Sequence, residues 1–218
     1  MTRERVIETA RRMIEEGGVE ALSMRKLAAE LGVAPTGIYW HVGGREQLLS
    51  EIVDEVVDEM ADLRPTGATP RDRMASVARQ MRRQVLAHPY LVELARELGQ
   101  GPATAFPGQV ALAREATAAG LHGDDGADAV RALLWLVGGF VMLERLPQQP
   151  DQPVQRTTTQ ELWRDVRDDD IDAGLAKAMT RMPDPDALFE TSLDALLDAI
   201  VPPSTSPGKK AARATKRG

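Results

Sequence analysis

The 218-residue chain contains no cysteine and few aromatic residues. The absence of cysteine excludes disulfide bonds, thiolate metal sites and a cysteine nucleophile, and it fits the reducing cytoplasm in which we expect the protein to act. Phenylalanine, tryptophan and tyrosine together make up 4% of the chain. This scarcity favours helices, because strands draw heavily on aromatic and β-branched residues.

Long hydrophobic runs are also missing. The first residues alternate charged with apolar side chains and do not read as a secretory signal peptide. The longest apolar run, near residues 132–143, is too short to span a bilayer, so no membrane association is expected. No Gly-rich phosphate loop, metal-ligand cluster or Ser/His/Asp arrangement stands out. An enzyme is therefore the least favoured function class, and we expect neither a metal nor a cofactor.

The charge balance is acidic, with a formal net charge of −6, which is mildly unfavourable for a protein that binds nucleic acid. Basic and acidic residues are equally numerous within residues 1–46, so the excess acid lies elsewhere. If the chain binds DNA, the placement of its basic side chains must achieve what the total charge does not.

Apolar residues recur at helical spacing, and no segment alternates as a strand would. The pattern predicts an all-α protein of about nine or ten helices. The predicted domains are a helix-turn-helix unit at 1–47, a helical ligand-binding and dimerisation domain at 48–202, and a disordered basic tail at 203–218. Glycine, serine and proline mark the helix ends. The first six predicted helices lie at about 3–16, 24–31, 35–41, 45–60, 74–85 and 91–98. The seventh ends near residue 119. The remaining ones lie at about 125–145, at 160–182 with an interruption near 168–170, and at 184–201.

The second and third predicted helices are joined by the tight turn Gly32-Val33-Ala34, an arrangement that sends its second helix into the major groove of DNA. In this second helix only Ile38 is plainly a core residue. Three consecutive large side chains, Tyr39, Trp40 and His41, point in different directions and cannot all be buried on one face. Their apolar bodies can pack on sugars while their O–H and N–H groups meet phosphate oxygens. The alternative is a purely structural three-helix core.

Further candidate DNA contacts lie around this helix. Pro35 suits its first turn, and Thr36 and Gly37 follow, where the backbone can approach a base edge or a thymine methyl group closely. Arg25 and Arg45 flank the unit, and a guanidinium suits either guanine or phosphate.

The string LSMRKLAAELGVAPTGIYWHVGGREQLL, residues 22–49, closely resembles the TetR family of bacterial transcription regulators. Its Tyr-Trp-His triplet is similar to the tetracycline-repressor branch. The resemblance implies that Arg25 contacts a base or phosphate, that the triplet contacts the DNA backbone, and that Arg45 matches a basic residue at the start of helix four. The base-reading positions differ, because Pro35, Thr36 and Gly37 stand where the tetracycline repressor has Gln-Pro-Thr. We therefore expect a different operator.

The resemblance also implies a ligand pocket inside helices five to eight. Each candidate residue for this pocket fits an ordinary core position better than a ligand contact. Glu97-Leu98-Gly99 falls where the tetracycline-repressor branch has a metal-binding His-Leu-Gly, so no magnesium–tetracycline site is expected. The candidate ligand contacts are Met60, Met81, Leu94, Leu112, Trp135, Phe140 and Leu143.

A single helix-turn-helix reads too few base pairs, and such proteins usually dimerise. The helices at about 125–145 and 184–201 are the expected homodimer interface, because the first is apolar nearly all round and Gly138-Gly139 permits close approach. It could instead be the central core helix of a monomer. The predicted function is a homodimeric repressor that a small molecule releases from double-stranded operator DNA. The alternative is a regulator of the same fold without a small-molecule effector, acting as an activator or through a protein partner.

Overall fold

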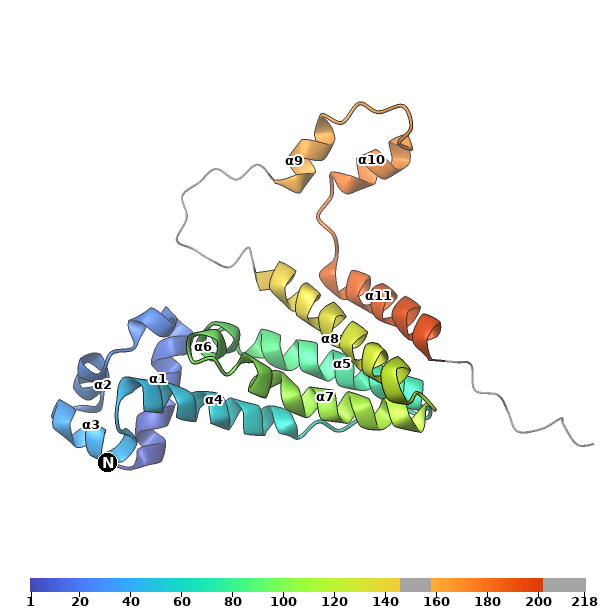
Figure 1. Ribbon diagram of the computed structural model, residues 1–218. Coiled ribbons are helices and arrows are strands. Elements are labelled where there is room, and N and C mark those ends of the chain that lie inside the picture. The colour runs from blue at the N-terminus through green and yellow to red at the C-terminus, as the bar shows by residue number, and fades with distance from the viewer. Residues whose placement is uncertain (146–157, 202–218) are drawn as a thin grey trace, which may run out of the picture.

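The structure is a computed structural model that describes residues 1–145 and 158–201 (Figure 1). Within these residues it is all helical, as predicted, and has eleven α-helices, one or two more than expected. The predicted tail at 203–218 lies outside the described residues. The elements are α1 (Arg3–Gly17), the 3-10 helix η1 (Val19–Ala21), α2 (Met24–Leu31), α3 (Pro35–Val42), α4 (Arg45–Ala61), α5 (Pro70–Ala87), α6 (Leu91–Glu97), α7 (Gly101–Ala118), α8 (Gly123–Arg145), α9 (Thr159–Arg164), α10 (Ala173–Met179) and α11 (Pro185–Ile200).

The first core is built by α1 to α4 together with α6. Thr2 and Ser23 cap α1 and α2, because their side chains accept hydrogen bonds from the backbone N–H groups of Arg5 and Lys26. Leu91 and Leu94 of α6 are buried in the same cluster as the helix-turn-helix. The predicted domain boundary at 47/48 therefore falls inside α4, and packing continues across it. The members of this core include Val6, Ile14, Leu27, Ile38, Leu48, Ile52, Tyr90, Leu91 and Leu94.

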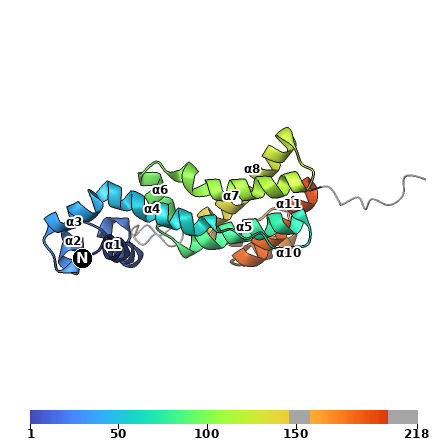
Figure 2. The same cartoon turned by 90° about the horizontal axis from the view of Figure 1, so that it is seen from below.

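The second core joins α5, α7, α8 and α11, which lie at the end of the elongated molecule away from α3 (Figures 1 and 2). Phe189 of α11 is fully buried at its centre. The Phe140 and Phe189 rings meet edge-on, with 5.3 Å between their centroids. The Arg82 guanidinium lies over the Phe189 ring, 4.7 Å from its centroid. Other members are Met74, Val77, Met81, Leu112, Leu133, Val137, Leu193 and Leu197.

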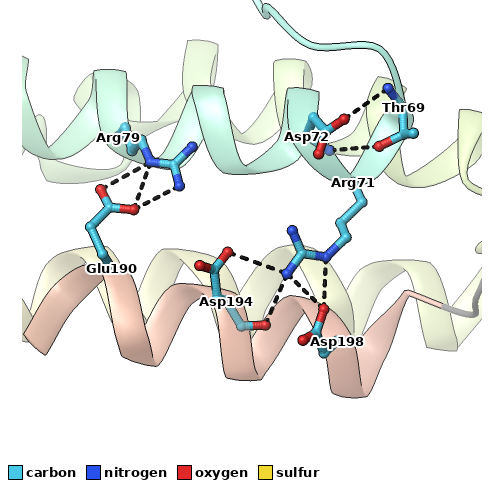
Figure 3. A network of polar contacts seen from close by, with 7 residues as sticks. All are labelled: Thr69, Arg71, Asp72, Arg79, Glu190, Asp194 and Asp198. Atoms are coloured by element: carbon cyan, nitrogen blue, oxygen red, sulfur yellow. Dashed lines mark hydrogen bonds and ion pairs between the residues drawn. The ribbon is translucent and has the colours of Figure 1, made fainter.

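A ladder of ion pairs follows the seam between α5 and α11 (Figure 3). Arg71 lies 2.6 Å from a carboxylate oxygen of Asp198 and 3.2 Å from one of Asp194, and Arg79 lies 2.6 Å from Glu190. One turn further along, Arg82 pairs with Asp186 at 2.7 Å and with Glu144 of α8 at 2.8 Å. The acids recur every four residues along α11, so all of them face the arginines of α5.

The helical pair α9–α10 stands away from the rest of the molecule (Figure 1). None of its residues is buried. The sequence predicted one interrupted helical region here, and the structure has two short helices because Asp172 caps a new helix, accepting a hydrogen bond from the Leu175 N–H.

Helix α8 exposes much of its apolar surface. The apolar run near 132–143 is too short to cross a membrane, but α8 as a whole is long and apolar enough by length and composition. A single helix of this kind is weak evidence, since core helices of soluble proteins have the same properties. Its buried residues, including Leu133 and Val137, belong to the second core.

Candidate DNA-binding surface

Helix α3 is anchored by two residues and exposes most of the others. Ile38 and Val42 are 0% and 1% exposed, four residues apart on one side of the helix. Trp40 is 90% exposed and Tyr39 50%, although large aromatic side chains are normally well covered. A single eight-residue helix cannot bury four successive positions, so anchoring Ile38 and Val42 leaves Tyr39 and Trp40 outside. His41 is exposed as well.

The turn before α3 fixes how the helix is presented. Gly32 ends α2 in the left-handed conformation, with φ 68°, and its N–H donates to the carbonyls of Ala28 and Ala29. A residue with a Cβ is strained at this φ, so glycine permits the tight connection. Pro35 begins α3, where its missing N–H costs nothing. Pro35 and Thr36 are exposed at this leading turn, and Gly37 is half-buried.

The charges near α3 are distributed unequally. Arg25 and Lys26 of α2 and Arg5 of α1 are exposed, and none of them lies in an ion pair with another described residue. By contrast, Arg11 pairs with Glu59 at 2.8 Å, and Arg12 pairs with Glu30 at 2.8 Å. Within α1 and α2, the two helices that support α3, the basic side chains Arg5, Arg25 and Lys26 are thus without acidic partners among the described residues. Lys26 and Arg5 were not among the sequence candidates, although Lys26 directly follows Arg25.

Arg45 differs from the other candidates. Its side chain is 34% exposed, its Nε and Nη2 donate to the carbonyls of Leu22 and Val19 at 3.3 Å, and its Nη1 pairs with Glu97 at 2.8 Å. Three of its five N–H donors thus have partners within the protein. A DNA contact by Arg45 stays a prediction, and the structure shows a second role that spacing along the sequence could not reveal.

The candidate ligand contacts are divided between different parts of the structure, although Met81, Leu112 and Phe140 share the second core. Leu94 belongs to the first core, because α6 packs on the helix-turn-helix, while Met81 and Leu112 are buried in the second. Trp135 and Leu143 are 81% and 65% exposed, so they do not line an internal pocket in this structure. Helical periodicity could not separate them from core residues, because α8 is apolar on both faces. Phe140 is half-buried against the second core, and the side chain of Met60 lies outside the described part of the structure.

Two hollows on the described residues are open to solvent. One lies on the surface of α1, and the other, of about 310 Å³, lies between α5 and α11. Arg79, Arg82, Phe189 and Glu190 line the second hollow, and all take part in the seam already described. Across residues 1–145 and 158–201, no group of three His, Asp or Glu side chains could hold a metal ion.

The arrangement is that of a helical protein with an N-terminal helix-turn-helix, an architecture typical of DNA-binding regulators. Residues 6–52 match the family described as "Bacterial regulatory proteins, tetR family". An "HTH-type transcriptional regulator" of Saccharopolyspora erythraea is 33% identical over 95 residues, covering 44% of this chain and 40% of that protein. The "Tetracycline repressor protein class C" of Escherichia coli is 38% identical over 72 residues, covering 33% of this chain and 31% of the repressor. The matches thus span less than half of these relatives.

Solved structures extend the similarity to nearly the whole chain. SCO7222, a TetR from Streptomyces coelicolor, superposes with a TM-score of 0.70 and 26% identity, covering 92% of this chain and 98% of that one. ActR of the same organism, in complex with (S)-DNPA, gives a TM-score of 0.65 and 25% identity, covering 92% and 96%. Residues 6–52 therefore belong to the TetR family of bacterial regulators, and the fold of nearly the whole chain is similar to that of solved TetR proteins. Its relatives are named as regulators of transcription, in agreement with the expectation that it is not an enzyme.

Proposed function

We propose that the protein is a homodimeric transcriptional repressor of the cytoplasm that a small-molecule ligand releases from its operator DNA. The single observation that supports this most is Trp40, 90% exposed on a helix whose other side is locked into the core by Ile38. The Trp40 indole is exposed to solvent on a helix that the core holds in place, so it is available to contact DNA. Several relatives named as repressors contain the same kind of unit.

The proposed DNA surface is α3 with the neighbouring part of α2. Thr36 and Gly37 approach base edges, and Tyr39, Trp40 and His41 contact the sugar-phosphate backbone. Arg25 contacts a base or a phosphate from the side of α2. The complete set is Arg25, Pro35, Thr36, Gly37, Tyr39, Trp40 and His41, with Arg45 at its edge.

The proposed dimer interface is the exposed face of α8 and α11. Trp135 and Met142 of α8 are 81% and 69% exposed, and Leu188 of α11 is 47% exposed. A methyl group added to Gly138 or Gly139 would meet no other atom within 4 Å, so this part of α8 offers room for the close approach of another helix. A contiguous apolar surface on a soluble protein marks an interaction site. A two-fold arrangement would let two α3 helices enter successive major grooves about 34–36 Å apart.

Response to a ligand is supported by the solved ActR complex, which contains (S)-DNPA. A ligand can release DNA only if it binds the released state better than the DNA-bound state. The exposure of Trp135 and Leu143, two of the candidate contacts, favours the alternative, a regulator of the same fold without a small-molecule effector. A titration with (S)-DNPA as first probe, followed by gel shift, tests the response.

Selection of duplexes from a random library by the purified protein tests the proposed function. We expect enrichment of an inverted repeat with half-sites about one helical turn apart. Analytical ultracentrifugation of the complex should give two protein chains per duplex. Selection that yields no common sequence, with no binding at low salt, would contradict the proposal.

A further inference from the structure

Three segments meet at the side chain of Arg45. It is the first residue of α4, and its guanidinium donates to the carbonyls of Val19 and Leu22, both at 3.3 Å. These carbonyls lie in η1 and in the connection that leads to Ser23, the cap of α2. On its other side the guanidinium lies 2.8 Å from the Glu97 carboxylate, at the end of α6. One side chain thus joins the entry of the helix-turn-helix to a helix that lies outside it.

A second polar contact fastens the same junction. The Gln100 side-chain amide donates to the Ser50 hydroxyl at 2.8 Å, so the residue before α7 is attached to α4 one and a half turns beyond Arg45. Below the two contacts, Leu91 and Leu94 of α6 are buried in the core of α1 to α4. Helix α6 is therefore fixed to the DNA-binding unit by its apolar face and at its C-terminal end. That end leads into α7, which packs in the second core.

We infer that Glu97 is a positioning residue for DNA binding, acting through Arg45. The pair holds the entry of α2 against the start of α4, and α2 in turn supports α3. Without Glu97, Arg45 keeps only hydrogen bonds to two carbonyls, so the start of α4 is held less firmly against the entry of α2. Glu97 touches no proposed DNA contact except Arg45, so a simple contact map of the DNA surface would omit it.

The charge of Glu97 could mask this effect, because removing any acid near DNA strengthens binding through long-range attraction. Glu93 is a matched control. It lies one turn earlier on α6, is exposed, and carries the same charge. Comparing Glu97→Gln with Glu93→Gln removes the long-range contribution and leaves the effect of the ion pair.

The test measures binding of the full chain to its selected duplex by fluorescence anisotropy, and it rests on the proposed DNA-binding function. We expect Glu97→Gln to bind about twofold to fivefold more weakly than Glu93→Gln, the range that a partly exposed ion pair can contribute. Urea unfolding of both variants should coincide with that of the wild type, because an ion pair this exposed adds little stability. Arg45→Ala should weaken binding, and adding Glu97→Gln to it should cause no further loss.

The outcomes are distinct. Equal affinities of Glu97→Gln and Glu93→Gln would overturn the inference while leaving the proposed function intact. A normal effect of Glu97→Gln in the Arg45→Ala background would also overturn it. If Arg45→Ala lowers the salt slope by about one while Glu97→Gln has no effect, Arg45 is a phosphate contact instead. A wild-type protein that binds no duplex would refute the proposed function itself.

Discussion

Two neighbours on α3 should separate folding from DNA binding. Ile38 is 0% exposed in the first core, whereas Trp40 is 90% exposed. Ile38→Ala removes buried methyl groups and leaves a cavity, so the free energy of unfolding should fall by about 2–5 kcal/mol. Trp40→Ala removes a side chain that buries almost nothing, so the free energy of unfolding should change by no more than about 0.5 kcal/mol.

For DNA binding, in contrast to folding, we expect Trp40→Ala to have a large direct effect. If the Trp40 indole N–H donates to a phosphate oxygen, its loss costs about 1.5–3 kcal/mol, because hydrogen bonds to charged groups are the stronger ones. At 1.4 kcal/mol per factor of ten, Trp40→Ala should bind the selected duplex at least about tenfold more weakly. Its affinity for variant duplexes should fall by the same factor, since backbone contacts carry no base information.

Urea unfolding followed by circular dichroism measures the first quantity, and fluorescence anisotropy with a labelled duplex measures the second. Trp40→Phe is a control that keeps a smaller aromatic ring and loses the N–H donor. The reasoning would be refuted if Trp40→Ala destabilised the fold by more than about 1 kcal/mol, or if it bound the duplex like the wild type.

Three further predictions concern the rest of the molecule. Trp135→Glu places a charge on the proposed dimer face. Sedimentation should then show a monomer, and circular dichroism should show unchanged helix content. A dimer that persists would place the interface elsewhere. Arg82→Met leaves the 16%-exposed Glu144 carboxylate without its partner and should lower the free energy of unfolding by about 1–3 kcal/mol, which urea unfolding would detect. Burial, aided by the nearby Arg11 guanidinium, lowers the pKa of His88 below 6.5. The folded state therefore favours neutral His88, and the free energy of unfolding should fall as the pH drops from 6.5 through the lower, folded-state pKa. In unfolding curves recorded at a series of pH values, His88→Gln should remove this decrease.

The helix-turn-helix could be predicted from the sequence because its signals are local. Ser23 caps α2, Gly32 ends it and Pro35 begins α3, as expected from residue type and position. These preferences act within a few residues of backbone, so distant packing does not overrule them. The exposure of Tyr39 and Trp40 follows from the same local geometry.

The candidate ligand contacts and the role of Arg45 could not be predicted in this way. Trp135 and Leu133 lie two residues apart in one apolar run, yet one is 81% exposed and the other fully buried. Only the positions of α5, α7 and α11 decide which face is covered. The partner of Arg45 lies 52 residues away on another helix, and no spacing rule joins them.

The acidity of the chain can be reconciled with DNA binding through α11. Asp186, Glu190, Asp194 and Asp198 give this helix four acids and no base, and α4 carries a further six acids and one base. Each acid of α11 is paired with an arginine of α5 at 3.2 Å or less, so its field is largely cancelled where it arises. What remains is screened over about 8 Å at physiological ionic strength, whereas α4, which runs between the two ends of the molecule, is about 25 Å long. At the proposed DNA surface, phosphates would therefore meet the local charge of Arg5, Arg25 and Lys26 more directly than the net charge of the chain.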